Sequence, residues 1–366
     1  MSDPELAVSL IDARDPAVVG GKGASLGELT RAGVAVPAGF VVTVDAFVAA
    51  MAGVDPSGAL RAEVEALTAG DLGAVAVVAA RVRALVADEP TPDHVAAAIV
   101  AAYGRLAGVG RPGEIMIDAD VAVRSSATVE DGSDASFAGL QDTYLGVSGP
   151  HSVLEHVRRC WASLYNDESV AYRRRLGLPE AGVSMAVVVQ RMVAPRAAGV
   201  MFTRSPVTGD RSVVAIEATW GLGSALVSGD VTPDAFVISK ITGDITTRRV
   251  SPKIKIHRYL PNGRGVTVSD TPAPLREAPS LSDDEIRALA AIGRRVEAHY
   301  GAPQDIEWAV LDDDSGAAAD AASAADRVVL LQSRPETVWA AREQTPAGAP
   351  KPRPADHVLA LFGKPL

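Results

Sequence analysis

One stretch of the chain, residues 120–146, combines a short apolar run, a fixed positive charge and a long loop of small residues: DVAVRSSATVEDGSDASFAGLQDTYLG. Val121 to Val123 predict a buried strand, and Arg124 then places a permanent charge with a fork of donors at the end of that strand. Small residues in the loop let backbone N–H groups approach an oxyanion closely, and its hydroxyls add further donors. The stretch therefore predicts a phosphate site, although an ordinary surface loop after an edge strand has the same composition.

Length and composition limit the fold and the partners. A chain of 366 residues allows one large or two medium domains, and its abundant Ala, Val and Gly with few aromatics are expected for buried strands and Ala-rich helices. The formal charge of −10 argues against nucleic acid as the main partner. The single cysteine, Cys160, excludes an internal disulfide and a multi-thiolate metal site. The N-terminus lacks a signal-peptide pattern and no apolar run reaches membrane-spanning length, so we expect no membrane association and a cytoplasmic location.

Lys22 lies in a glycine-rich segment, VVGGKGASLGEL over residues 18–29, just ahead of a helical pattern opened by Ala24 and Ser25. The N–H groups and the dipole of a helix N-terminus both favour anions, so Lys22 is a candidate phosphate ligand. The spacing GxxxxGK[ST] is absent, which disfavours a P-loop. A solvated lysine in a glycine turn is the alternative interpretation.

Two later segments have simpler local patterns. VSMAVVVQRMV, residues 183–193, predicts a fully buried strand, and its Gln190 needs a hydrogen-bond partner, either inside the protein or on the amino edge of adenine. Ser282 and Glu285 form a capping box ahead of a helix over residues 286–300, and Gly301 is a natural stop.

Two short strands near the C-terminus carry oxygen ligands and a second arginine. QDIEWAVL, residues 304–311, contains Glu307, and RVVLLQSRPETVW, residues 327–339, contains Gln332 and Arg334. A carboxylate and an amide oxygen on neighbouring strands can hold Mg2+, which keeps waters or phosphate oxygens for its other positions. Taken one at a time, Glu307 and Gln332 favour structural roles over metal binding.

The segment VRSSATVEDGSDASFAGLQDTYL resembles the nucleotide-binding loop of the phosphoenolpyruvate synthase and pyruvate phosphate dikinase family. It departs from the usual form at Gly132-Ser133, where the family has Leu-Pro, and at Leu140, where the family commonly has Gln. GGKGASLGEL followed by AGVAVPAGFVVT resembles the opening of the same family, and DIEW with LLQSRP resembles its C-terminal signature. The resemblance covers about residues 15 to 340, with the motifs in the family's order.

The resemblance implies an α+β fold of the ATP-grasp type, in which two subdomains clamp ATP between them. The corresponding division is residues 1–183 with the phosphate loop, 184–340 with the metal site, and 341–366 as a Pro/Ala-rich linker and tail. The implied cofactors are ATP and Mg2+. The resemblance implies that Lys22, Arg124 and Arg334 bind phosphate and stabilise its charge, and that Gly139 and Thr143 also contact the nucleotide. It further implies that Gln190 recognises adenine and that Glu307 and Gln332 bind the metal.

The activity that the resemblance implies is phosphorylation of a histidine by Mg-ATP, with AMP and orthophosphate as products. The family carries this histidine in a Gly-rich, His-Ala segment of a mobile domain, and none of the chain's histidines has that context: His94, His151, His156, His257, His299 and His357. We therefore expect a separate partner subunit to carry the phosphohistidine, as in phenylphosphate synthase, and to bind a phenolic or other small acceptor. Pyruvate and an antibiotic stay open as acceptors. An ADP-forming ATP-grasp ligase and a non-catalytic nucleotide sensor are the alternatives.

Overall fold

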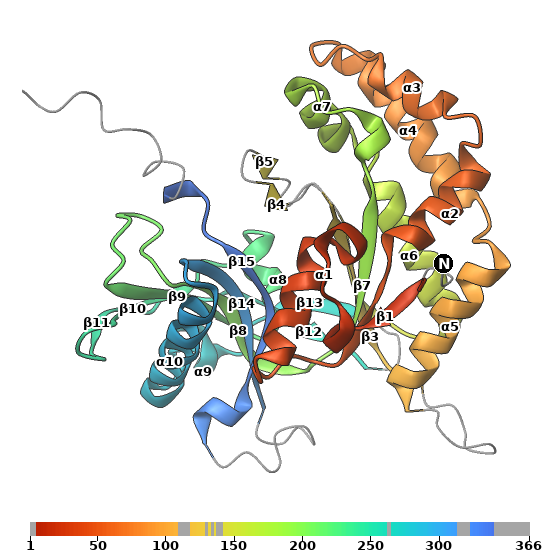
Figure 1. Ribbon diagram of the computed structural model, residues 1–366. Helices are drawn as coiled ribbons and strands as arrows, with labels where there is room; N and C mark the ends of the chain where they lie inside the picture. Colours follow the sequence, from red (N-terminus) through yellow and green to blue (C-terminus); the bar gives the residue numbers. More distant parts are fainter. Residues whose placement is uncertain are drawn as a thin grey trace, which may run out of the picture.

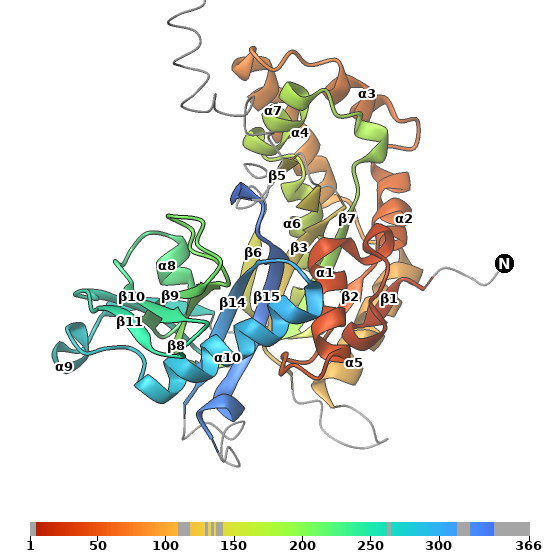
Figure 2. The same cartoon turned by 60° about the vertical axis from the view of Figure 1, so that its left-hand side comes forward.

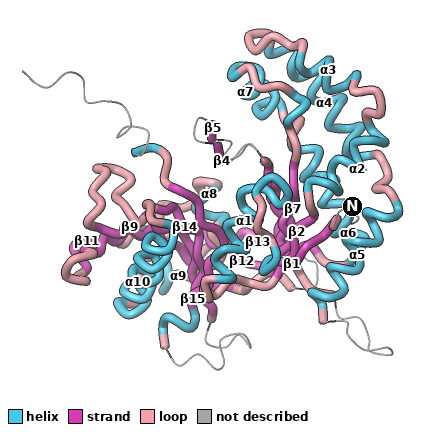
Figure 3. Tube along the Cα trace, viewed as in Figure 1, coloured by secondary structure: helices cyan, strands magenta, loops and turns pink. Residues whose placement is uncertain are grey.

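The computed structural model describes residues 5–108, 118–128, 131–132, 135–136, 142–261, 265–312 and 323–339. In these ranges the chain is a mixture of helices and antiparallel strands, with two larger sheets standing beside each other (Figures 1 and 3). The five-stranded sheet has the order β1-β2-β7-β3-β6, and the six-stranded sheet has the order β11-β10-β9-β8-β14-β15. Two small hairpins, β12-β13 and β4-β5, complete the described strands.

The five-stranded sheet is built around β7. Its strands are β1 (Ala7–Ser9), β2 (Gly39–Val42), β7 (Met185–Arg191), β3 (Val121–Ala127) and β6 (Thr143–Val147). All neighbouring pairs are antiparallel, and β7 pairs with both β2 and β3. Every residue of β7 from Met185 to Gln190 is buried, which confirms the fully buried strand predicted from the apolar run.

Most of the helices cover one flank of this sheet and extend beyond its edge (Figure 1). They are α2 (Val44–Val54), α3 (Ala59–Glu65), α4 (Leu72–Asp88), α5 (Asp93–Ala107), α6 (Pro150–Ser163) and α7 (Asp167–Leu176), with short 3-10 turns η1 (Leu10–Asp12) and η2 (Glu180–Gly182). Their apolar faces form one core with β3 and β7, in which Phe47 and Trp161 pack edge to face at 6.1 Å between ring centroids. Cys160 is a free, buried thiol in this core.

The six-stranded sheet forms the second half of the molecule. Its strands are β8 (Pro195–Phe202), β9 (Val213–Trp220), β10 (Asp234–Ser239), β11 (Ile245–Arg249), β14 (Gln304–Leu311) and β15 (Val328–Pro335). α10 (Asp283–Tyr300) packs on one face, and Trp308 with Ile286 and Leu289 belongs to the core between them. The remaining elements are α8 (Ser224–Val227), β12 (Lys255–Tyr259), β13 (Val266–Asp270), α9 (Ala273–Arg276), η3 (Ala324–Arg327) and the two-residue strands β4 (Asp131–Gly132) and β5 (Ala135–Ser136).

The chain passes from the first sheet to the second over residues 192–194, between β7 and β8. The boundary expected from the sequence, at residue 183, lies before β7 and would place this strand in the second half. In the structure β7 lies inside the first sheet because its uninterrupted apolar residues are buried on both sides. Residues 341–366 lie outside the described ranges.

α1 (Pro16–Arg31) lies between the two sheets in both ribbon views (Figures 1 and 2). It contacts β3 and β7 of the first sheet and β15 of the second. Leu26 packs with Val41 and Val188, whereas Leu29 is part of the core under α10. Successive turns of one helix therefore bury apolar side chains in both halves. No helix in the described ranges is long and apolar enough to cross a bilayer.

The N-terminus of α10 is held by the predicted capping box, which the structure confirms. The buried Glu285 carboxylate accepts hydrogen bonds from Ser282 N at 2.8 Å and from Arg196 Nη2 of β8 at 2.6 Å. Burial favours the protonated form of this carboxyl, but the Ser282 N–H and the Arg196 guanidinium outweigh it and lower the pKa of Glu285. Ionised Glu285 thus ties α10 to the sheet.

We expect Glu285→Gln to lower the free energy of unfolding at pH 7 by about 1–3 kcal/mol, since a buried charged hydrogen bond is lost. A carboxylate whose pKa is lower in the folded than in the unfolded protein stabilises the fold at pH values above its unfolded-state pKa. This contribution is lost as the pH falls through the folded-state pKa. Urea unfolding at pH 7 and near pH 3 should therefore show a smaller difference at the lower pH. Asp284→Asn, at an exposed side chain of the same helix turn, is the control. Equal losses at both pH values would contradict this account.

Candidate functional site

A cleft of about 430 Å³ lies between the two sheets. Its walls come from β3, β6 and β7 on one side and from β8, β14 and β15 on the other, with the connection at residues 192–195 and residues 222–228 closing the ends. Apolar side chains dominate and a few polar groups are placed among them, which is the usual composition of a small-molecule site.

Arg124 is the polar group that joins the two walls. Its side chain is mostly buried, and Nη1 donates to Leu331 O at 2.7 Å while Nη2 donates to Glu307 Oε2 at 2.6 Å and to Gln332 Oε1 at 2.8 Å. Its Nε is also buried and has no hydrogen-bond partner among the described residues. The guanidinium therefore holds β3 against β14 and β15, and its Nε donor is left without a partner in the described part of the chain.

The placement of Arg124 within its strand differs from the prediction. The sequence suggests that the strand ends at Arg124, but β3 continues to Ala127, and Arg124 stands opposite Val188 of β7 and Thr143 of β6. Ser126 suits a buried strand because its small side chain finds a partner: Ser126 Oγ donates to Val19 O of α1 at 3.1 Å. The loop residues 133–134 and 137–141, including Gly139, lie outside the described ranges.

Glu307 and Gln332 stand directly opposite each other on β14 and β15. Because one Arg124 nitrogen contacts both side-chain oxygens, these oxygens converge on a common point. A carboxylate with an amide oxygen is a donor set that suits Mg2+, which takes its other ligands from water or phosphate. No group of three or more His, Cys, Asp or Glu side chains able to hold a metal occurs in the described part of the chain.

Gln190 and Thr143 belong to the same cleft. Thr143 is exposed at the start of β6 and faces Arg124 across the strand pair. Gln190 is buried in β7, lines the cleft, and donates from Nε2 to Pro37 O at 3.2 Å. Of the two partners that the sequence left open for this amide, the internal one is therefore present, and the side chain still forms part of the cleft wall.

Lys22 is placed by a break in α1. Gly20 has φ 68° and ψ 168°, so the helix that begins at Pro16 is interrupted there and resumes with Lys22 in its first turn. The helix thus begins earlier than Ala24, but Lys22 does follow a new helical start. A Cβ on Gly20 would lie 2.1 Å from Ser126 O, so only glycine fits this close approach. Lys22 is half-buried and is not among the residues that line the cleft.

Arg334 stands on β15 opposite Asp305, with 3.5 Å between its Nε and Asp305 Oδ2. Burial raises the pKa of Asp305 to about 6 in spite of the nearby guanidinium. Because strand side chains alternate, Arg334 shares a face with Gln332, roughly 7 Å along the strand. The structure therefore brings Arg124, Glu307 and Gln332 into contact, places Thr143 and Gln190 on the same cleft, and leaves Lys22 and Arg334 outside its wall.

The sequence did not identify the wall formed by residues 222–228. Ser224 lines the cleft, its Oγ lies 3.0 Å from His257 Nδ1, and His257 Nε2 lies 3.1 Å from Asp230 Oδ2. Glu217 of β9 was also left without a role. It stands opposite Val200, which in turn stands opposite Glu307, so the two carboxylates share one face of the sheet. The only sequence signal for this wall was a glycine-rich turn after a strand.

The family model described as "Pyruvate phosphate dikinase, AMP/ATP-binding domain" matches residues 16–353. A rifampicin phosphotransferase of Streptomyces sp is 48% identical over 307 residues, which cover 83% of this chain and 34% of that protein. A probable phosphoenolpyruvate synthase of Methanothermobacter thermautotrophicus is 41% identical over 333 residues, or 90% and 46% of the two chains. A rifampicin phosphotransferase of Bacillus subtilis is 38% identical over 338 residues, or 92% and 36%. The chain thus spans less than half the length of these relatives.

The break at Gly20 generates a prediction about stability. Gly20→Ala adds a methyl group against Ser126 O as well as strain from the positive φ, so we expect a loss of at least about 3 kcal/mol in the free energy of unfolding. Gly33 is the matched control, because its φ is 69° but a Cβ there would meet nothing within 4 Å. Gly33→Ala should cost about 1–2 kcal/mol. If denaturant unfolding gave equal losses of free energy for Gly20→Ala and Gly33→Ala, the close approach of α1 to β3 at Gly20 would be contradicted.

Proposed function

The chain belongs to the pyruvate phosphate dikinase AMP/ATP-binding domain family, and on that premise we propose that it binds Mg-ATP in the cleft between its two sheets. We further propose an ATP-grasp arrangement in which each sheet with its helices forms one subdomain of a clamp. The proposed reaction uses ATP and water: one phosphate is transferred to a histidine on a partner subunit, a second is released to water as orthophosphate, and AMP is the nucleotide product. The partner then passes the phosphate to a phenolic or other small acceptor.

The observation that carries this proposal is the convergence at Arg124. A permanent cation, a carboxylate and an amide oxygen from three strands meet at the edge of the cleft. A polyphosphate requires cations and a metal in one place, because most of the catalysis of phosphoryl transfer is positioning and neutralisation of charge. The Nε of Arg124 is a further buried donor, with no hydrogen-bond partner among the described residues.

The remaining assignments are part of the proposal. Glu307 and Gln332 would hold Mg2+, which would supply positive charge against the phosphates. Arg124 and Arg334 would stabilise phosphate charge, and Lys22 would bind phosphate at its helix start. Gln190 would contact the adenine amino edge, with Thr143 and Gly139 on the phosphate-loop side.

The acceptor histidine is part of the proposal. None of the histidines that the structure describes lines the cleft. We propose that a partner subunit brings the histidine to the nucleotide, as in the divided arrangement of phenylphosphate synthase. The names of the relatives favour two other acceptors, pyruvate and rifampicin, for the same nucleotide chemistry.

The decisive experiment combines the protein with Mg2+, ATP labelled in the β-phosphate, and candidate partner subunits, beginning with the product of the neighbouring gene. Label on a partner histidine together with AMP would support the proposal. ADP formed without a phosphoprotein would instead indicate a ligase. Nucleotide binding without turnover would indicate a sensor, and so would partner phosphorylation that is undiminished by Arg334→Ala.

Lys22→Ala and Arg124→Met should each reduce phosphotransfer by at least about 100-fold, since each removes a cation from the developing charge. Thermal unfolding should show that both proteins remain folded. Arg249→Ala, at an exposed position of the edge strand β11, removes the same charge away from the cleft and should leave the rate unchanged. Wild-type rates in either site variant would contradict the assigned roles.

A further inference from the structure

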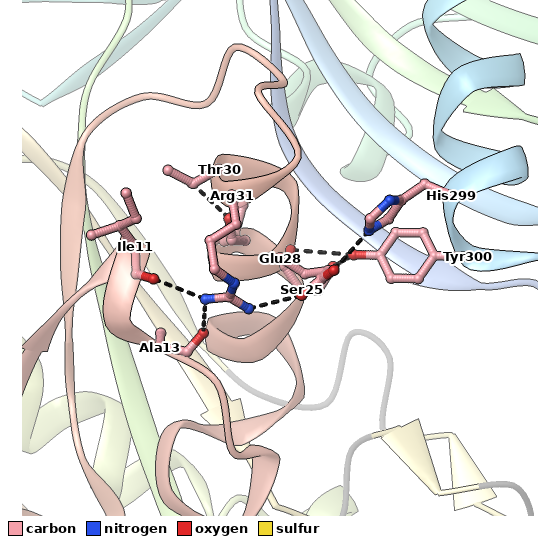
Figure 4. A network of polar contacts seen from close by, with 9 residues as sticks. Ile11, Ala13, Ser25, Glu28, Thr30, Arg31, His299 and Tyr300 are labelled. Atoms are coloured by element: carbon pink, nitrogen blue, oxygen red, sulfur yellow. Dashed lines mark hydrogen bonds and ion pairs between the residues drawn. The ribbon is translucent and has the colours of Figure 1, made fainter.

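Ser25 lies one helical turn after Lys22 on α1, at the point where this helix meets the second half of the molecule. Figure 4 shows Ser25 and Glu28 on one side of α1 with Tyr300 and His299, from the C-terminal end of α10, pointing toward them. The residues in contact are about 275 positions apart in the sequence. This junction therefore fixes how the lysine-bearing helix sits against the second half.

The Ser25 hydroxyl makes a short bond to the strand that carries the proposed metal and phosphate residues. Its Oγ donates to Ser333 O at 2.6 Å. Ser333 lies between Gln332 and Arg334 on β15, and its own hydroxyl donates to Gln304 Oε1 at 3.0 Å on β14. A shift of α1 relative to this carbonyl would therefore change the position of Lys22 relative to both neighbours of Ser333.

The direction of this hydrogen bond is unusual for a helical serine. Hydroxyls of Ser and Thr inside helices commonly donate to the carbonyl four residues earlier. Thr30 on the same helix does so, with its Oγ1 donating to Leu26 O at 2.7 Å. Ser25 donates out of its helix to β15 instead, so its hydroxyl joins two elements and Thr30 joins none.

Contacts around Ser25 hold the junction in place. Tyr300 donates from its hydroxyl to Ser25 O at 3.3 Å, and burial raises the pKa of this phenol, so it stays a donor at neutral pH. One turn along, Glu28 is bound by Arg31 at 2.9 Å and lies 2.7 Å from His299 Nε2. The hydrogen bonds from Arg31 and His299 lower the pKa of Glu28, which keeps the carboxylate charged.

We propose that Ser25 is a positioning residue, which sets the distance between Lys22 and the phosphate- and metal-binding side chains of β15. This inference rests on the proposed function, because it concerns how cations from the two halves reach one triphosphate. A single neutral hydrogen bond contributes only about 1 kcal/mol to stability, so α1 stays folded without it. Catalytic geometry is far more sensitive, since a displacement of about 1 Å can cost about 100-fold in rate.

Three variants test the proposal: Ser25→Ala, Ser25→Thr and Thr30→Ala. Ser25→Ala should lower kcat for phosphotransfer by at least about 10-fold while KM for ATP stays within about 3-fold, because position rather than binding is lost. Ser25→Thr keeps the hydroxyl and should restore the rate. Thr30→Ala removes an equivalent hydroxyl from the same helix and should behave as wild type. Equal rates for Ser25→Ala and Thr30→Ala, or no rescue by Ser25→Thr, would overturn the proposal.

A measurement without turnover separates this inference from the proposed function. Amide hydrogen exchange of the ATP-free protein should be several-fold faster over residues 21–27 and 331–335 in Ser25→Ala, and unchanged there in Thr30→Ala. Calorimetric titration of the wild-type protein with Mg-ATP tests the nucleotide site itself. Absence of ATP binding would overturn the proposed function, whereas unchanged exchange in Ser25→Ala would overturn the role of Ser25.

Discussion

The Arg124 guanidinium is the contact on which the arrangement of the two sheets depends. A charge buried to this extent must be paired, and its partners all lie on the opposite sheet: Leu331 O, Glu307 and Gln332. β3 therefore stays against β14 and β15 as long as these bonds persist. The same contact pairs the Glu307 carboxylate with the positive charge of Arg124, so the two side chains together carry no net charge. A phosphate group could replace the carboxylate as the partner of the arginine, and a divalent cation could replace the arginine as the partner of the carboxylate.

α1 supplies a second link of a different kind. It buries Leu26 in the first half and Leu29 in the second, and it adds the Ser25 hydrogen bond to β15. The chain itself crosses from one larger sheet to the other at residues 192–194 after β7, next to the cleft. Side-chain contacts therefore set the relative position of the halves as much as the covalent connection does. A nucleotide that binds between the halves would act on these contacts directly.

Family membership accounts for the nucleotide part of the activity and leaves the acceptor as a proposal. The relatives are two to three times longer than the portion of them that this chain matches, and their names differ in the acceptor they specify. This is consistent with a common ATP-binding unit that serves several acceptors. Fold alone does not choose among them, because the acceptor is selected by its own binding site.

The sequence by itself determined the local elements and the set of candidate residues. The apolar run around residue 188 predicted a buried strand, Ser282 and Glu285 predicted a helix start, and the motifs of Arg124, Glu307 and Gln332 predicted a phosphate and metal site. Only the tertiary structure decided that β7 lies within the first sheet, that Arg124 stands inside β3 rather than at its end, and that Ser25 bonds to β15. Periodicity and capping act over a few residues, so they can be recognised locally. Side-chain hydrogen bonds such as these join segments 107 to 308 residues apart, and their geometry is set by packing that no local pattern contains.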